Sequence, residues 1–546
     1  MKTMKEGFSR ILALVVVQLF LAVPMSVGNL FAQQNADTLR CKEYLKGLEA
    51  YKTGDYSTAV KVWKDVAKEG DALAQCNLGT CYYLGRGVEQ NYGKAFSWFK
   101  KSAVQGNDVA QCNIGNCYYN GYGTRCDIEE AVKWYTLAAD RGNVAAMTNL
   151  GVCYKLGDGV GADSVKAFDY IQLAAKKGYP VAWNEIGDCF FYGIGVQPNP
   201  DEAFYWYKKA AEQGVEAAQY NVAMCYAYGD GVFQDDENAF YWLSKSADKG
   251  YDKAQYALAE SYLKGLGVAS DTVKAVMWYE KAALQGNSDA QYILACCYYS
   301  GYGTKENHYV AAKWFAKAAR SGNADAMCQL AGCYYWDDGV DYNYKMAMEL
   351  YEKAAELGNA EAMYCLAEYS VDGNLKMAFD RYCKAAELGF VPAYNKVGNY
   401  HYLGLVDSVN YKEAARWYRM GAEAGDADAQ YNLAQCYYSG HGVKENNTTA
   451  IRWFAKSATQ GNVNAQYLLG TMYYNGLRVQ QDYEMAVLWY SKAAKMEHPA
   501  ALYDLGICYY YGYGVAKSRD NAIKLWKQSA ELEFEDAIET LKEMRR

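Results

Sequence analysis

Cysteine is the residue best able to do chemistry in this chain of 546 residues, which contains 17 of them. Many lie in one kind of stretch, of which residues 110–124, AQCNIGNCYYNGYGT, are an example. Two cysteines five residues apart, beside tyrosines and glycines, could belong to a metal site or a redox site. The same residues could instead pack in one copy of a repeated unit. Recurrence of the stretch distinguishes the two interpretations.

A second set of residues resembles a catalytic serine site. Ser97 with Lys100, and Ser246 with Lys249, form Ser-x-x-Lys strings, and residues 52–54 are Lys-Thr-Gly. Serine β-lactamases combine these elements with Ser-Asp-Asn in one pocket, where the serine is the nucleophile. Because the chain contains no Ser-Asp-Asn, we interpret the strings as chance occurrences and predict no catalytic residue.

Histidine and cysteine spacings give no indication of a metal site. The four histidines, His308, His401, His441 and His498, are widely separated in the sequence. Neither Cys-x-x-Cys nor His-x-x-x-His occurs, although structural metal sites are usually built from ligand pairs at such short spacings. We therefore expect no metal and no other cofactor.

The cysteine-containing stretch recurs along nearly the whole chain. Further copies begin at residues 74, 290, 429 and 501, and each is followed by a second block that resembles AFSWFKKSAVQG. The glycine closing that block recurs every 36 residues from Gly70 to Gly358, then after 31 residues at Gly389, and after 36 residues again up to Gly461. A fixed period of this kind predicts a repeat array.

Each unit is expected to contain two helices. Numbered from the residue after the closing glycine, position 4 is alanine in all thirteen units, position 8 is aliphatic and position 9 is glycine or alanine. With a frequent tyrosine at position 12, these residues form one helical stripe, and the small residue at position 9 allows close helix approach. Paired glycines such as Gly121 and Gly123 end the first helix. A second amphipathic segment follows, so neighbouring pairs must stack into an all-α solenoid.

The pattern A…LG..Y..G.GV…..KA..WY.KAA..G resembles the Sel-one-like repeat family, a relative of the tetratricopeptide repeats. The resemblance covers residues 71–533 as thirteen units and is irregular at 323–425. Residues 36–70 resemble a single tetratricopeptide helix pair, and residues 534–546 are expected to form a C-terminal capping helix. The resemblance implies a right-handed α/α solenoid and a non-catalytic adaptor that holds proteins or peptides.

The cysteines are expected to be buried free thiols. Nine occupy position 11, where other units have Ser261, Met472 or Tyr400, as is typical of a packing position. Equivalent positions in stacked helices are roughly 8–10 Å apart, whereas a disulfide requires Cα atoms within roughly 7 Å. Some exported relatives in the family link their helices through cysteines seven apart, a spacing that is missing here. The nine are Cys81, Cys117, Cys153, Cys189, Cys225, Cys297, Cys333, Cys436 and Cys508.

The pattern of residues at the N-terminus predicts that the protein is exported. Residues 1–10 contain three basic side chains, and an apolar run, ILALVVVQLFLAV, follows before a cleavage point behind Ala32. We interpret residues 1–32 as a signal peptide, with an uncleaved anchor as the alternative. The mature chain is then periplasmic or secreted, with no membrane span. A net charge of −8 argues against nucleic acid as a partner.

Tyrosines offer the one candidate binding surface. Positions 6, 10 and 13 share a stripe beside position 12, and the resemblance to tetratricopeptide arrays places that stripe on the concave face. Tyrosine suits peptide or glycan because it combines an apolar face with a hydroxyl. Alternatively, these tyrosines merely pack between neighbouring first helices. The candidate residues are Tyr292, Tyr299, Tyr335, Tyr364, Tyr402, Tyr431, Tyr438, Tyr467, Tyr474, Tyr503 and Tyr510.

The function predicted from these observations is an exported, non-catalytic scaffold that binds a protein or extended peptide in the cell envelope. Two other classes stay open. One is an enzyme or regulator acting on cell-wall glycan, peptide or β-lactam, because some exported relatives in the family have a β-lactamase label. The other is a carbohydrate-binding module that uses the same tyrosines.

Overall fold

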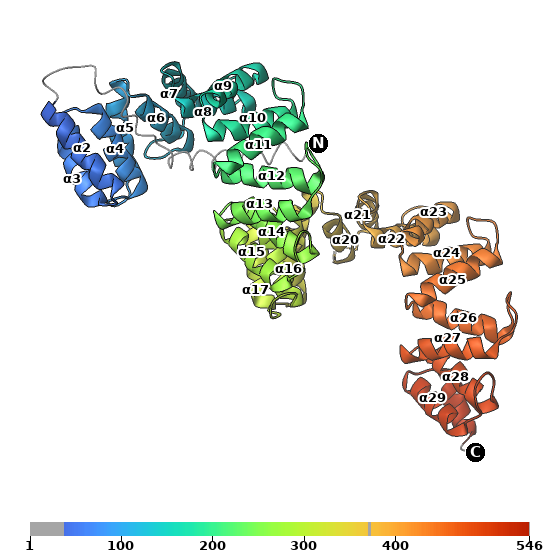
Figure 1. Ribbon diagram of the computed structural model, residues 1–546. Helices are drawn as coiled ribbons and strands as arrows, with labels where there is room; N and C mark the ends of the chain where they lie inside the picture. The colour runs from blue at the N-terminus through green and yellow to red at the C-terminus, as the bar shows by residue number, and fades with distance from the viewer. Residues whose placement is uncertain (1–37, 370–372, 545–546) are drawn as a thin grey trace. The chain divides into compact units, whose positions relative to one another are not determined.

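The computed structural model describes residues 38–369 and 373–544, and these contain helices and connecting loops but no strand. The expected signal peptide, residues 1–32, lies outside the described residues. The all-α prediction is confirmed, and the described helices follow one another as successive pairs (Figure 1). The chain divides into two compact units, residues 1–287 and 288–546.

Fourteen helices lie in the described part of the first unit. They are α2 (Thr38–Lys52), α3 (Tyr56–Lys68), α4 (Ala72–Leu84), α5 (Tyr92–Val104), α6 (Asp108–Asn120), α7 (Ile128–Asp140), α8 (Val144–Leu156), α9 (Ser164–Lys176), α10 (Pro180–Tyr192), α11 (Pro200–Glu212), α12 (Glu216–Tyr228), α13 (Asp236–Asp248), α14 (Asp252–Lys264) and α15 (Thr272–Leu284). Each even-numbered helix from α4 to α28 is the first helix of a repeat, and the next is its second helix.

The second unit continues the same order. Its helices are α16 (Ser288–Ser300), α17 (His308–Arg320), α18 (Ala324–Trp336), α19 (Tyr344–Glu356), α20 (Ala360–Tyr369), α21 (Leu375–Glu387), α22 (Val391–Leu403), α23 (Tyr411–Glu423), α24 (Ala427–Ser439), α25 (Asn447–Thr459), α26 (Val463–Asn475), α27 (Tyr483–Lys495), α28 (Pro499–Tyr511), α29 (Arg519–Glu531) and α30 (Glu535–Glu543). Residues 71–533 therefore contain thirteen helix pairs, and α30 follows the last of them.

Capping residues set the helix ends in each repeat, as the second repeat illustrates. The Asn107 side chain accepts a hydrogen bond from the Ala110 N–H at 2.8 Å, which satisfies a free donor at the start of α6. Gly121 ends α6 in the left-handed conformation and donates its N–H to the Cys117 carbonyl. Asp127 then caps α7 by accepting from the Glu130 N–H. The glycines were therefore correctly interpreted as helix ends.

The core of each repeat lies where position 9 of the first helix meets position 29 of the second. A Cβ added to Gly115 would lie 2.5 Å from the Tyr135 ring, and one added to Gly470 would lie 2.5 Å from the Tyr490 ring. The predicted close helix approach is therefore confirmed. Position 29 is buried in all thirteen repeats, whereas position 12, expected on the core stripe, is half-buried in examples such as Tyr437 and Tyr473.

Backbone contacts and buried polar side chains join successive repeats. A Cβ on the second loop glycine would overlap the first residue of the preceding second helix, as Gly442 would overlap the Tyr411 carbonyl oxygen. Gln430 donates its amide to the Ala422 carbonyl at 3.1 Å across the same boundary. The fixed period thus reflects contacts between repeats as well as folding within each.

Regular geometry is interrupted in the second unit. Asp337 replaces the first loop glycine of the eighth repeat and adopts the left-handed conformation with φ 58°. The ninth repeat is five residues shorter than the others, and Val406 replaces the second loop glycine of the tenth. Arg478 takes that glycine position in the twelfth repeat, with φ 63°.

Candidate functional site

The position-11 cysteines lie in the core and are poor nucleophiles. All nine are buried, and none of the sixteen cysteines with described side chains forms a disulfide. Burial raises the pKa of the Cys81 thiol, as of Cys436, to about 12. Because the thiolate is the reactive form, these side chains act as small packing groups, as the sequence predicted.

The serine motifs are separate structural features. Ser246 is fully buried on α13, and its hydroxyl donates to the Glu216 carbonyl at 2.7 Å. Thr53, from Lys-Thr-Gly, follows α2 and donates to the Glu49 carbonyl at 3.1 Å. Ser97 is exposed on α5. Within the part of the chain that the structure describes, no group of three or more His, Cys, Asp or Glu is suited to a metal ion.

The position-6 tyrosines lie on the first helices and rest on the buried residue at position 29. Ring centroids are 5.7 Å apart for Tyr431 and Phe454, and 5.9 Å apart for Tyr467 and Tyr490. The remaining members of this set are also half-buried, so each ring has one face covered by its own repeat. They are Tyr292, Tyr364 and Tyr503.

The position-13 tyrosines contact both their own second helix and the next loop. Tyr402 lies 5.0 Å from Tyr411 and 5.8 Å from His441, measured between ring centroids. Tyr299 stacks on His308 at 4.5 Å and donates its hydroxyl to Asp338. Tyr299 is exposed, whereas Tyr335, Tyr402, Tyr438, Tyr474 and Tyr510 are half-buried. Much of each ring therefore packs between repeats.

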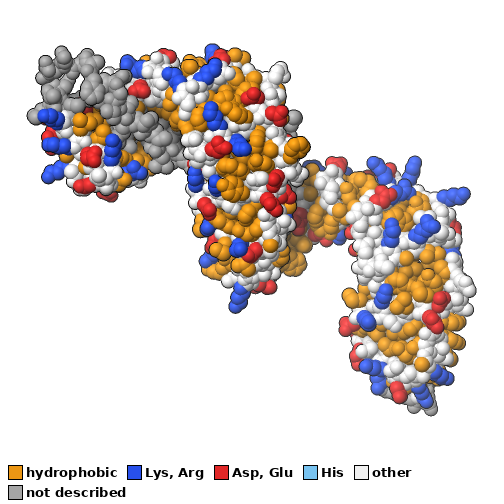
Figure 2. Space-filling view, viewed as in Figure 1, with side chains coloured by type: hydrophobic (Ala, Val, Ile, Leu, Met, Phe, Trp, Pro, Cys, Tyr) orange, Lys and Arg blue, Asp and Glu red, His pale blue; other side chains and the backbone are white. Residues whose placement is uncertain are grey.

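The two tyrosine sets converge in the last three repeats. Tyr431 and Tyr438 both contact the Phe454 ring, at 5.7 and 6.4 Å. The pairs Tyr467 with Tyr474, and Tyr503 with Tyr510, contact Tyr490 and Trp526 in the same way. We call these six tyrosines the C-terminal tyrosine face. Hydrophobic side chains gather in patches over α24 to α27 in the space-filling view (Figure 2).

Three hydroxyls of this face are available to a ligand. Among the described residues, no hydrogen-bond partner contacts the hydroxyl of Tyr438, Tyr474 or Tyr510. The hydroxyl of Tyr402, by contrast, is hydrogen-bonded to His441 at 2.9 Å. An aromatic ring held in place with an unpaired hydroxyl can accept or donate one hydrogen bond to a bound backbone.

Sequence reasoning missed the more exposed position beside this face. Position 14 is exposed as Trp336 (66%), Leu403 (60%) and Tyr511 (57%) in the second unit, and Tyr511 lies 5.0 Å from Tyr510. Tyr228 has 74% exposure at the same position in the first unit. Large apolar residues immediately before the first loop glycine were the available signal.

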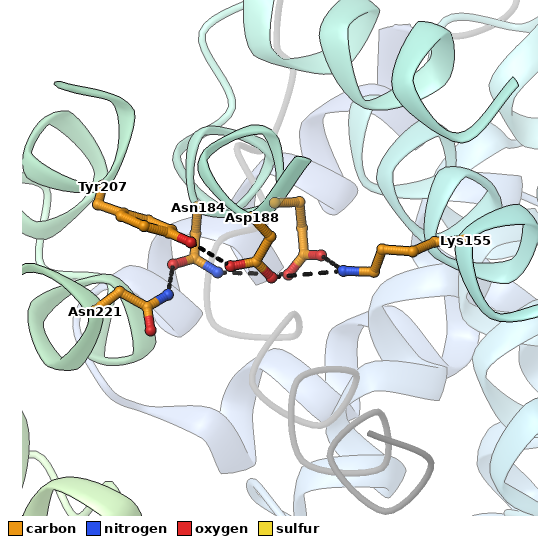
Figure 3. Close-up of polar contacts among 6 residues, drawn as sticks. Lys155, Asn184, Asp188, Tyr207 and Asn221 are labelled. Atoms are coloured by element: carbon orange, nitrogen blue, oxygen red, sulfur yellow. Dashed lines mark hydrogen bonds and ion pairs between the residues drawn. The ribbon is translucent and has the colours of Figure 1, made fainter. Parts of the chain in front are cut away.

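A buried ionic cluster in the first unit was also missed (Figure 3). Lys155 occupies position 13 and lies 2.7 Å from Glu185 and 3.5 Å from Asp188, both in the next repeat. Burial alone would lower the pKa of Lys155, but the two carboxylates outweigh it and hold the pKa above its ordinary value. Burial raises the pKa of Asp188 to about 6. Tyr207 donates to Asp188 at 2.8 Å, so the cluster is internally satisfied.

Comparison with protein families gave a match to the Sel1 repeat. The matched residues are 72–107, 108–143, 144–179, 181–215, 216–251, 252–287, 288–323, 324–359, 391–426, 427–462, 463–498 and 499–534. These twelve ranges leave out most of the shortened ninth repeat. A comparison with curated proteins found no match.

Two similar solved structures are repeat proteins of bacteria. A protective antigen with an SLR fold, present in uropathogenic Escherichia coli strains, is 31% identical with a TM-score of 0.50, and the match covers 89% of this chain and 97% of that chain. A Sel1 repeat protein from Oxalobacter formigenes is 30% identical with a TM-score of 0.43, covering 64% of this chain and 99% of that chain.

Proposed function

The chain belongs to the Sel1 repeat family, and from that premise we propose that it is an exported scaffold that binds an extended protein segment on the C-terminal tyrosine face. Sel1 repeat proteins are generally non-catalytic and mediate protein interactions. None of the described helices has both the length and the apolar character needed to cross a bilayer. Residues 1–32, outside the described part, are the leader that this proposal requires.

The observation that supports this site is the repetition of one arrangement three times in succession. In each of the last three repeats, two tyrosines rest on one buried aromatic residue, and the position-13 hydroxyl is unpaired. An extended chain also repeats its backbone groups at regular intervals, so such an array can contact several of them at once. Tyrosine is favoured at such surfaces because a large ring is ordered at little entropic cost.

The partner is proposed to be a protein or peptide of the cell envelope. Gln435 and Thr471 at position 10 are uncharged, which favours backbone and apolar contacts. Arg478, whose guanidinium lies 4.3 Å from the Tyr438 ring centroid, adds a cation at the edge of the face. Glycan binding by the same rings is the second candidate, because the exposed Tyr511 extends the aromatic surface. A cell-wall or β-lactam enzyme is less well supported, since Ser246 and Thr53 already donate to backbone carbonyls.

Alanine substitution tests the face while separating binding from folding. The full chain, used as bait in an envelope extract, recovers a partner that is identified by mass spectrometry and then titrated directly. Tyr438→Ala combined with Tyr510→Ala is expected to weaken that binding about tenfold or more, since hot-spot aromatics contribute about 1–2 kcal/mol each. Tyr438→Phe with Tyr510→Phe preserves the rings and should weaken it less.

The matched control lies in the first unit. Tyr119→Ala with Phe191→Ala changes half-buried aromatic residues at position 13 in two repeats outside the proposed face, so partner binding should stay unchanged. The proposal fails if the C-terminal variant binds as tightly as wild type, or if both variants lose binding only in proportion to a lowered melting temperature. Release of the partner by soluble cell-wall glycan would favour the second candidate.

A further inference from the structure

Among the cysteines whose side chains the structure describes, Cys328 and Cys365 lie at facing positions across a repeat boundary and pack in one hydrophobic cluster. Cys328 lies on α18 and Cys365 on α20, the first helices of the eighth and ninth repeats. Both belong to one hydrophobic cluster, together with Tyr351, Ala331 and Leu366. Each thiol shifts the pKa of the other, as neighbouring groups do.

The same two positions meet elsewhere in the array, which supports this contact independently. Cys328 is at position 6 of its repeat, and Cys365 is at position 7 of the next. At equivalent places Asn221 donates to Asn184 at 3.0 Å, and Asn432 donates to Asn395 at 2.8 Å. Side chains at position 6 and at the following position 7 therefore touch as a rule. Only the Cys328–Cys365 boundary places a thiol on both sides.

A tyrosine hydroxyl completes the cluster. At position 29, Tyr135 and Tyr418 donate to an asparagine at position 10 of the same repeat, each at 2.8 Å. In the eighth repeat position 10 is Gly332, which has no side chain to accept the bond. The Tyr351 side chain instead packs in the same cluster as Cys365, and it helps to lower the pKa of that thiol. The cysteine is thus held between a hydroxyl and a second thiol.

From this geometry we infer that Cys328 and Cys365 are a disulfide-forming pair, which links the eighth and ninth repeats when the chain meets an oxidised dithiol or oxidised glutathione. Cys365, half-buried, is the attacking residue, and Cys328, buried, is the resolving residue. The inference concerns a covalent modification and does not depend on the partner proposed above.

The exchange balances in two steps. The Cys365 thiolate attacks one sulfur of oxidised glutathione, which forms a mixed disulfide and releases a glutathione thiolate. Cys328 then loses its proton and attacks the Cys365 sulfur, which closes the protein disulfide and releases the second glutathione as a thiolate. Two protein thiols are oxidised and one glutathione disulfide is reduced. The neighbouring Cys328 thiol and Tyr351 hydroxyl lower the pKa of Cys365, which favours the first step.

Thiol mapping tests the pair directly. The folded full chain is incubated with oxidised glutathione, quenched with acid, alkylated and analysed by mass spectrometry. We expect a peptide cross-linked through Cys328 and Cys365, with both thiols lost from the alkylation pattern. The exposed Cys126 provides an internal reference, because it should retain a glutathione adduct. An adduct that persists on Cys365 while Cys328 is still alkylated would overturn the inference.

Two variants distinguish a resolving thiol from a neighbour. Cys328→Ala should trap a stable glutathione adduct on Cys365, whereas Cys383→Ser, which changes a half-buried cysteine on α21, should leave the cross-link unchanged. Modification of Cys365 should also be about tenfold faster than that of Cys383, whose pKa burial raises to about 11. Equal rates at the two cysteines, or no adduct in Cys328→Ala, would count against the pair.

Discussion

At the scale of single residues, glycine is required in this array for two different physical reasons. Gly442 and Gly425 both have left-handed backbones, with φ 72° and 100°. A Cβ on Gly442 would overlap the Tyr411 carbonyl oxygen, whereas a Cβ on Gly425 would meet nothing within 4 Å. Backbone strain is therefore shared by the two positions, and steric exclusion belongs to Gly442 alone.

Alanine at these two positions should separate the effects. Gly425→Ala is expected to cost the left-handed strain alone, about 1–2 kcal/mol. Gly442→Ala should cost more, because the first turn of α23 must also move away from the loop. Thermal unfolding of the full chain measures both, and equal melting temperatures for the two variants would show that the loop accommodates a methyl group.

The structural role of a residue could be predicted where its contacts lie within one repeat. It could not be predicted where the contacts lie in the neighbouring repeat. Position 9 was correctly identified because a small residue on an apolar stripe has a simple packing reason. Position 12 does pack against the core, as Tyr437 and Tyr473 show, but it is only half-buried because the residue at position 29 fills the centre of the repeat. The ion pairs of Lys155 were missed because its partners, Glu185 and Asp188, belong to the next repeat.

At the scale of elements, His308 links α17 to the following loop. It begins α17, stacks on Tyr299, and contacts the Asp338 carboxylate with one ring nitrogen and Glu306 at 3.0 Å with the other. The hydrogen bond with Asp338 raises the pKa of His308 above its ordinary 6.5. The protonated ring therefore strengthens the boundary between the seventh and eighth repeats.

Stability at this boundary should depend on pH. Because the folded pKa exceeds the unfolded one, the contribution of His308 is fully present below about pH 6.5 and is lost as pH rises through the raised value. The melting temperature of wild type should fall across this window more steeply than that of Asp338→Asn, which leaves only Glu306 beside the ring. Parallel curves for the two proteins would mean that the ion pair contributes nothing.

The helix pairs themselves could be predicted in full from the sequence, whereas the connections between them could not. Capping residues such as Asn107 and Gly121 are local signals, so helix ends follow from spacing alone. The second loop glycine looked like part of the same turn, yet its restriction comes from a helix in the preceding repeat, as Gly442 and Tyr411 show. Interactions between repeats could not be predicted, because the two partners lie about one period apart in the sequence.

At the scale of the whole molecule, stability is distributed along the array. Within each unit, neighbouring repeats contact one another, so the stack is stabilised by the sum of these interfaces. Regular interfaces use the glycine contact described for Gly442, together with buried hydrogen bonds such as that from Gln430 to Ala422. A segment that lacks these features is expected to open before the rest of its unit.

Three successive repeats in the second unit depart from this regular pattern, although the eighth keeps the glycine contact through Gly339 and His308. In the eighth repeat, Asp337 adopts a left-handed backbone conformation, which is strained for a residue other than glycine. The ninth repeat is five residues shorter than the others, and in the tenth Val406 replaces the second loop glycine. Limited proteolysis of the full chain should therefore make its first cuts within residues 336–410. Asp337→Gly should slow cutting near the eighth repeat, because glycine adopts this backbone without strain. First cuts spread evenly over all loops would show instead that the irregular repeats are held as firmly as the regular ones.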